Sequence, residues 1–241
     1  ARRIQNGDFA RVDELVQGRH DALELLVLEP DDRAHVEQGL IEAELLLATG
    51  RLPMALAKAE RSANLARLAN HTDLLPAALT TQAEALAAQG ELQEAHDLFI
   101  EALTLAGRAA DRGGIARCHR SLALVQLRLG RVAEASDSAN QAMNAAQLFD
   151  DPLGRAAARL VLAQVLMAED RLPEALNHLE QARRAYNHLM ARLGLADSLG
   201  LMGALARRQG ALDQSEECYR RAHRQLEALG SREAAINQAR L

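Results

Sequence analysis

The chain has 241 residues, of which 49% are hydrophobic and only 2% aromatic, and its net charge is −5. This acidic balance disfavours direct binding of nucleic acid, and without Trp any core must be built from Leu, Ala, Val and Ile. No apolar run is long enough to predict a membrane-spanning helix, and no alternating β-branched stretch predicts a strand. Cys118 and Cys218 form no metal or redox motif, so we expect an all-α protein in a reduced, cytoplasmic setting.

The charge is distributed unevenly along the chain. Residues 1–60 carry a net charge of −5, whereas residues 181–241 carry +4. Ordinary solvated helix faces explain this asymmetry, and end-to-end contact between copies of the chain is the alternative. Lys58 is the only Lys beside many Arg residues, a bias that we interpret as the codon usage of a GC-rich bacterial genome.

One short phrase recurs at a fixed interval, without insertion or deletion. It begins at Gly50, Gly90, Gly130, Asp170 and Gly210, and a branched apolar residue follows two positions after each. A fixed period of this length is typical of solenoids, which grow by adding units rather than by enlarging one core.

Each period predicts two helices that are joined at this turn. The first helices are expected over ranges such as residues 36–49, 76–89 and 152–169. Longer second helices are expected over residues 92–110 and 172–191. Gly at the turn suits a helix C-terminus that ends in a left-handed conformation. Asp151 is a candidate N-cap, and Arg112-Gly113-Gly114 predicts a turn between helices.

Three columns of small residues recur in register, one in the first helix and two in the second. Small side chains at these places let paired helices approach closely. The columns are Ala43, Ala83, Ala123, Ala163 and Gly203; Ala55, Ala95, Ala135, Ala175 and Ser215; and Ser62, Ala102, Ala142, Ala182 and Ala222.

This pattern resembles the tetratricopeptide repeat over about residues 34–230, in five units. The period of 40 exceeds the family's usual length, and the Pro that ends the second helix in the family is absent. In this respect the chain is similar to the repeat arms of MalT-like transcriptional activators and of bacterial signalling proteins. The resemblance implies a right-handed superhelix of antiparallel helical hairpins.

Both ends of the chain fall inside a repeat. Residues 1–33 are expected to be a partial repeat that lacks its first helix, and residues 231–241 the start of a further first helix. We therefore expect the chain to be a fragment of a larger multidomain protein.

Residues for catalysis or metal binding are not grouped in the sequence. The eight His residues form no zinc motif, Cys118 and His119 are adjacent and so diverge on a helix, and no Gly-rich phosphate loop is present. We expect no enzymatic activity, no metal and no cofactor in this segment.

The resemblance implies that the first helix of each unit lines a concave groove. In the third unit Arg117, Arg120, Leu124 and Arg128 share one helix face, where guanidinium groups could hold a carboxylate or phosphate. The alternative is a solvated Arg stripe that pairs with a neighbouring acidic helix. The other candidate binding residues in the groove are Glu84, Leu160, Gln164 and Arg207.

These observations favour a protein–protein interaction scaffold in a bacterial regulatory or signalling protein. Its partner would be a protein or peptide segment, or another domain of the same parent, with neither nucleic acid nor a membrane as a direct partner. Two alternatives stay open. One is an arm that senses a small-molecule effector, and the other is an arm for self-association.

Overall fold

The computed structural model describes residues 32–109 and 111–228, which form ten α-helices and contain no strand. The helices are α2 (Asp32–Ala48), α3 (Leu52–Leu68), α4 (Leu75–Gln89), α5 (Leu92–Arg108), α6 (Arg112–Arg128), α7 (Val132–Leu148), α8 (Pro152–Ala168), α9 (Leu172–His188), α10 (Arg192–Arg208) and α11 (Leu212–Glu227). The expected further helix at residues 231–241 lies outside the described residues, as do residues 1–31 of the expected partial repeat.

The helices repeat at half the period that is visible in the sequence. Nine of the ten begin at evenly spaced positions between Asp32 and Leu212, and only α4 begins later than this spacing requires, at Leu75. Eight of the helices, first and second alike, have 17 residues, so the expectation of longer second helices is wrong. The equal helix lengths were not evident from the sequence, because first helices begin with residues that favour turns. Arg112-Gly113-Gly114 is such a start: it forms the first turn of α6, and Asp111 caps it by accepting a hydrogen bond from the Gly114 amide at 3.0 Å.

Residues in the left-handed backbone conformation follow the helices at the same interval, half the period of the sequence. Within a unit they are the five predicted turn residues, with φ between 61° and 101°. Between units, residues other than Gly adopt the same conformation: Asn70, Asp150 and Met190. The sequence pattern predicted the first set and missed the second, because four of the five residues in the first set are Gly and none in the second is.

Met190 is the least suited of these residues to its backbone. Its φ is 56° and its side chain is 78% exposed, so it has the strain of a left-handed conformation without compensating burial. We expect Met190→Gly to raise the free energy of unfolding by about 0.5–1.5 kcal/mol, since Gly adopts this conformation without a Cβ clash. Urea denaturation measures this change in the free energy of unfolding. An unchanged or lower midpoint, with an unchanged slope, would show that the loop is not strained.

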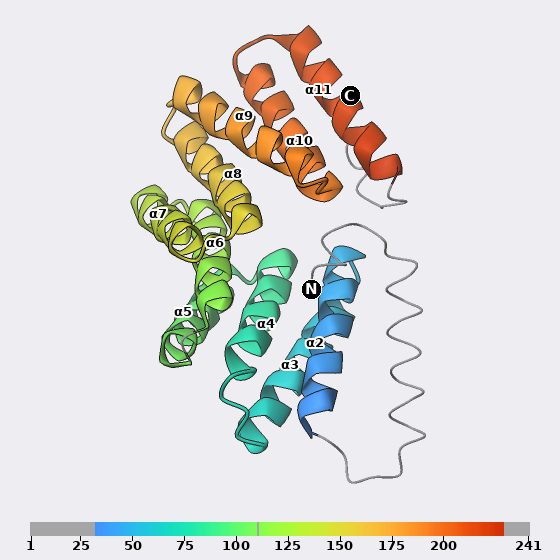
Figure 1. Ribbon diagram of the computed structural model, residues 1–241, viewed down its shortest axis with the longest axis vertical. Coiled ribbons are helices and arrows are strands. Elements are labelled where there is room, and N and C mark those ends of the chain that lie inside the picture. Colours follow the sequence, from blue (N-terminus) through green and yellow to red (C-terminus); the bar gives the residue numbers. More distant parts are fainter. Residues whose placement is uncertain (1–31, 110, 229–241) are drawn as a thin grey trace.

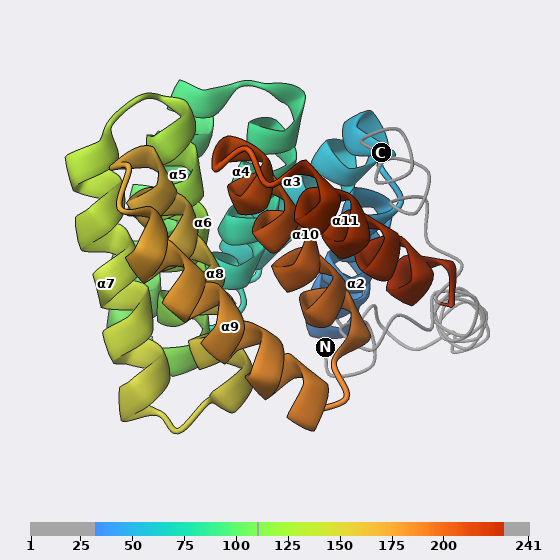
Figure 2. The ribbon, with the colours of Figure 1, turned by 90° about the horizontal axis from the view of Figure 1, so that it is seen from above.

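Consecutive helices pack as five antiparallel hairpins, α2/α3 to α10/α11, that wind into a superhelix (Figure 1). Each first helix also contacts the first helix of the next unit, through α2, α4, α6, α8 and α10. No pair of successive second helices within the described residues makes a contact of similar extent. Elements on the inside of a curved stack lie closer together than those outside, so the first helices form the inner face. Seen from above, α7 accordingly lies at the outer edge and α6 and α8 lie inward of it (Figure 2).

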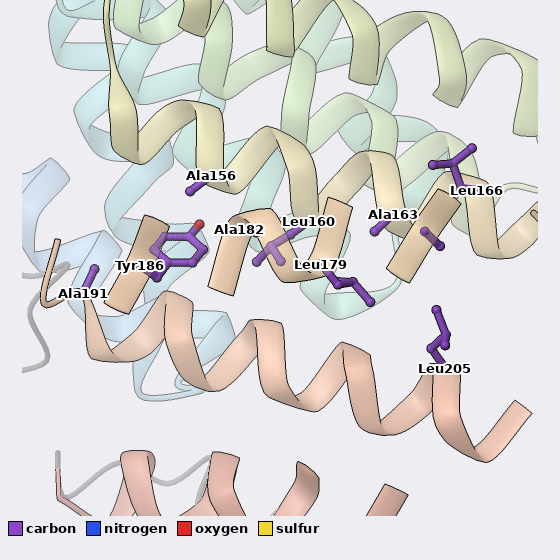
Figure 3. Packing of buried hydrophobic residues seen from close by; sticks show 10 residues of the cluster. Ala156, Leu160, Ala163, Leu166, Leu179, Ala182, Tyr186, Ala191 and Leu205 are labelled. Carbon is purple, nitrogen blue, oxygen red and sulfur yellow. The ribbon is translucent and has the colours of Figure 1, made fainter. Parts of the chain in front are cut away.

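The predicted columns of small residues are confirmed as contact positions between helices. All fifteen residues are buried. Larger side chains, such as Phe99, Leu179 and Tyr186, fill the space that these small residues leave between hairpins. Figure 3 shows one such cluster, where α9 inserts Leu179 and Tyr186 between α8 and α10. The core is thus a continuous seam along the stack.

Candidate functional site

The third unit places its two central Arg side chains on the inner face of the superhelix. Arg117 and Arg120 are three residues apart on α6, so they lie on neighbouring positions of one helix face. Both are half-buried. Their surroundings nevertheless differ completely, and this difference defines the candidate site.

Arg117 is held by carboxylates from two preceding units. Its Nε donates to Glu84 Oε1 at 3.1 Å and its Nη2 to Glu84 Oε2 at 2.6 Å, which is a two-pronged ion pair with α4. Its Nη1 pairs with Glu44 of α2. The Ser121 hydroxyl also donates to Glu84 Oε1, at 2.9 Å. One guanidinium group therefore links three first helices along the inner face.

The pKa values in this network reflect competition between burial and pairing. Burial alone would raise the pKa of Glu84, but the Arg117 charge and the hydrogen bonds from Arg117 and Ser121 outweigh it and hold that pKa below its ordinary value of 4.5. Burial likewise acts to lower the pKa of Arg117, and Glu84 and Glu44 reverse the effect. Both groups are therefore charged at neutral pH, and the pair stabilises the fold only in that state.

This network predicts a loss of stability in acid. A carboxyl group whose pKa is depressed by folding stabilises the native state above its unfolded pKa, and this contribution disappears as the pH falls below about 4.5. We expect the free energy of unfolding to decline more steeply between about pH 6 and 3 in the wild-type chain than in Glu84→Gln. Urea titrations at several pH values measure the two slopes. Parallel curves would contradict this account of Glu84.

Arg120 has no such partner. Among the described residues no carboxylate or carbonyl accepts a hydrogen bond from its guanidinium group. Burial lowers the pKa of Arg120, and the nearby charge of Arg117 lowers it further, while Glu84, Tyr186 and Asp151 act in the opposite direction without touching it. A half-buried cation without a partner is costly, which marks this position as a candidate binding site.

The other predicted site residues are spread along the inner face. Half-buried Leu124 lies one turn from Arg120, while Arg128 is exposed and donates to the Ala87 carbonyl at the end of α4. Leu160 is only 7% exposed and belongs to the core around Tyr186. Half-buried Gln164 donates weakly to the Leu160 carbonyl at 3.5 Å, and Arg207 is exposed on α10. Of the eight residues, only Arg117 and Glu84 are joined by a hydrogen bond between different helices within the described part of the chain.

Two features of this region were not predicted from the sequence, the pairing of Glu44 with Arg117 and the inward packing of Tyr186. Nothing in the pattern indicated that Arg117 would reach across α4 to contact Glu44. Tyr186 lies on a second helix, and its ring packs between α8 and α10. A usable signal existed: Tyr186 occupies a position that is Ala66, Ala106, Ala146 or Leu226 in the other units.

Neither a cluster of metal-ligand side chains nor a membrane-spanning helix is found among the described residues. Its His, Cys, Asp and Glu side chains form no group of three or more that could hold a metal ion. None of its helices is both long and apolar enough to cross a lipid bilayer.

The five stacked hairpins and the inner face lined by first helices define a helical-repeat scaffold. Part of it matches the tetratricopeptide repeat family. The sequence model of that family matches residues 74–147, which comprise α4 to α7, and hairpins of the same kind continue on both sides. The resemblance seen in the sequence is therefore confirmed, as is the all-α superhelix. No curated protein sequence matches the chain.

Solved structures with this architecture include proteins named for gene regulation and for signal transduction. BtubC from P. vanneervenii shares 18% identity with a TM-score of 0.64, over 92% of this chain and 91% of BtubC. The Rap conjugation gene regulator of plasmid pLS20, in complex with the Phr* peptide, shares 16% identity with a TM-score of 0.69, over 92% of this chain and 69% of the regulator. A signal transduction ATPase with a tetratricopeptide repeat sensor, from Pyrococcus horikoshii, shares 12% identity with a TM-score of 0.61, over 99% of this chain but only 39% of the ATPase. At these identities the similarity shows the fold alone.

Proposed function

We propose that this chain is the protein-binding scaffold of a bacterial regulatory or signalling protein, and that it binds an extended partner segment along its inner face. The observation that carries the proposal is Arg120, which has no hydrogen-bond or ion-pair partner within the described residues although it is half-buried on α6, a helix that contacts α4 and α8. A solenoid needs no charge at this position for its stability. The equivalent residues of the other units are Leu40, Thr80, Leu160 and Gly200.

The surroundings of Arg120 suit a chain-like ligand. Arg117, Glu84 and Glu44 form a fixed polar ridge on one side, and the partly exposed side chain of Leu124 offers apolar contact one helical turn away. A fixed surface of this kind binds a segment without first being ordered, which lowers the entropic cost of association. The related fold of a regulator in complex with the Phr* peptide supports a peptide-like partner.

We also propose that the chain acts within a regulatory protein. Two of the similar structures are named as a conjugation gene regulator and as a signal transduction ATPase with a repeat sensor. We infer that the present repeats act in the same general way, as the arm of a larger protein that receives a partner.

Site-specific photocrosslinking tests the proposed face. A photoreactive amino acid at Leu124, on the inner face, is compared with one at Asn140, which is exposed on α7 at the outer face. In cells that produce the protein natively, we expect a discrete crosslinked partner from position 124 and none from position 140. Equal adducts from both positions, or an adduct from position 140 alone, would reject the inner face as the binding surface.

A further inference from the structure

The second helix of the third unit, α7, is anchored in the stack by small side chains. It packs against α6 of its own unit and α8 of the next, at the outer edge of the superhelix (Figure 2). The side chains that it buries are all Ala or Ser: Ala135, Ser138, Ala139, Ala142, Ala145 and Ala146. Those that α5, α9 and α11 bury include Phe99, Leu179, Tyr186, Tyr219 and Leu226. Because hydrophobic stabilisation scales with the apolar area removed from water, α7 gains less from docking than these three helices.

Polar contacts do not compensate for this weak anchoring. Each of the other second helices has a side-chain hydrogen bond or ion pair to another helix: Lys58–Glu42 for α3, Glu101–Arg67 for α5, Gln181–Arg159 for α9 and Ser215–Gly203 for α11. Within the described residues the side chains of α7 pair only locally, Asn140 with the Ser136 carbonyl and Glu134 with Arg131 of the preceding turn. The side chains of α7 therefore hold it to α6 and α8 by packing alone.

Two polar side chains on one side of α6 have buried atoms without a partner. Gln126 is only 5% exposed and His119 is half-buried. Neither Gln126 Oε1 nor His119 Nδ1 takes part in a hydrogen bond within the described residues. The two residues are separated by about two helical turns, so they lie on the same side of α6.

The other hairpins show which helix this side of a first helix faces. Arg159 has the position of His119 in the fourth unit, and its Nε donates to Gln181 of α9 in the same hairpin at 3.0 Å. Gly39 has this position in the first unit, where a Cβ would lie 2.3 Å from Ser62 Oγ of α3. This side of a first helix therefore faces the second helix of its own hairpin, and both unpaired side chains of α6 face α7.

These unpaired atoms favour separation of α7 from α6. A buried polar atom without a partner has lost the hydrogen bond that water gives it, and opening of the interface restores that bond. The repeat does not require polar residues here, since Leu stands at these positions in several other units: Leu79 and Leu199 for His119, and Leu46, Leu86 and Leu166 for Gln126. The third hairpin thus combines weak apolar anchoring with a polar interface that is satisfied only when it opens.

We propose that α7 is a locally opening helix, which undocks from α6 and α8 while the neighbouring hairpins stay folded. Elements that move are drawn from the least stable parts of a fold, and α7 is such a part. Its departure uncovers Val161 and Val165 of α8, which cluster with Ala135 and Ala139 of α7 in the closed state. The superhelix therefore has a preferred point of opening at its third unit, and this property does not depend on a ligand at the inner face.

Hydrogen exchange followed by mass spectrometry of the full chain tests the proposal. The amides of α7 are compared with those of α5 and α9 in the wild-type chain, Gln126→Leu and His119→Leu. Both variants introduce the residue that the preceding unit has at the same position, so they suit the fold. Gln82→Leu is the matched control, because it makes the same change to a half-buried Gln on α4 of the preceding unit.

After correction for intrinsic rates, we expect the α7 amides of the wild-type chain to exchange about ten-fold faster, or more, than those of α5 and α9. Gln126→Leu should slow exchange in α7 about ten-fold, as expected when a buried polar atom without a partner is replaced by an apolar group, and should leave α5 and α9 unchanged. His119→Leu should act in the same direction, and Gln82→Leu should leave α7 unchanged. Equal protection of the three helices in the wild-type chain would overturn the proposal. So would an α7 that neither Leu variant of α6 slows, or that Gln82→Leu slows equally.

Discussion

Arg117→Met is expected to lower the free energy of unfolding by about 2–4 kcal/mol, because it leaves the Glu84 carboxylate half-buried without its cation. The Arg117 and Glu84 side chains are 27% and 25% exposed, so the expected cost lies towards the low end of that for a fully buried pair. Glu44 loses its contact with α6 at the same time. Urea denaturation followed by circular dichroism measures the change.

Arg120→Met is the matched control, since it replaces a similar side chain three residues away on the same helix. Arg120 has no hydrogen-bond or ion-pair partner among the described residues, so its removal relieves an unpaired charge and should leave stability unchanged or slightly higher. Equal destabilisation by the two variants would contradict the division of the two side chains into a structural and a ligand-binding role.

Gly194→Ala is expected to destabilise the chain by about 1–3 kcal/mol through overpacking. A Cβ at residue 194 would lie 2.5 Å from Tyr186 Cζ and closer still to two other ring carbons. The ring has little room to move, because Ala156 and Leu160 hold its other side. Thermal unfolding measures the change.

Gly200→Ala, on the same helix, is the control for helix propensity. A Cβ at residue 200 meets no atom within 4 Å, so this substitution should stabilise α10 by about 0.5–1 kcal/mol. Opposite signs for the two substitutions would show that contact with Tyr186, and not the loss of Gly as such, governs the effect at residue 194. If both variants were stabilised, the close packing between Tyr186 and Gly194 would be refuted.

The sequence predicted the backbone of this fold well because each feature recurs five times in register. The left-handed turn residue, the small contact residues and the pairing of helices are all periodic, and all are confirmed. Helix starts were harder to predict, because Asp111 caps α6 just before two Gly residues that resemble a turn. The equal length of the helices was not predicted, because the left-handed residues between units are Asn70, Asp150 and Met190 and not Gly.

The candidate site could be predicted only in part, because its residues are the ones that break the repeat. Helical spacing placed Arg117 and Arg120 on one face but gave both the same role. The two Arg side chains differ because Glu84 and Glu44 pair with Arg117 and not with Arg120. This pairing depends on how the units pack, which the sequence period does not reveal. The Tyr186 ring packs against α10 because Gly194 leaves room for it, which the repeat pattern does not indicate.

The central claim is that Arg120 on the inner face anchors the partner, and a loss-of-function comparison tests it most directly. With the photoreactive amino acid at Leu124, the yield of crosslinked partner is measured for the wild-type chain, Arg120→Gln and Arg207→Gln, the last an exposed Arg on the same face. The account predicts at least a ten-fold lower yield for Arg120→Gln, as expected when a buried charged contact is lost, and a nearly unchanged yield for Arg207→Gln. An undiminished yield for Arg120→Gln would contradict it.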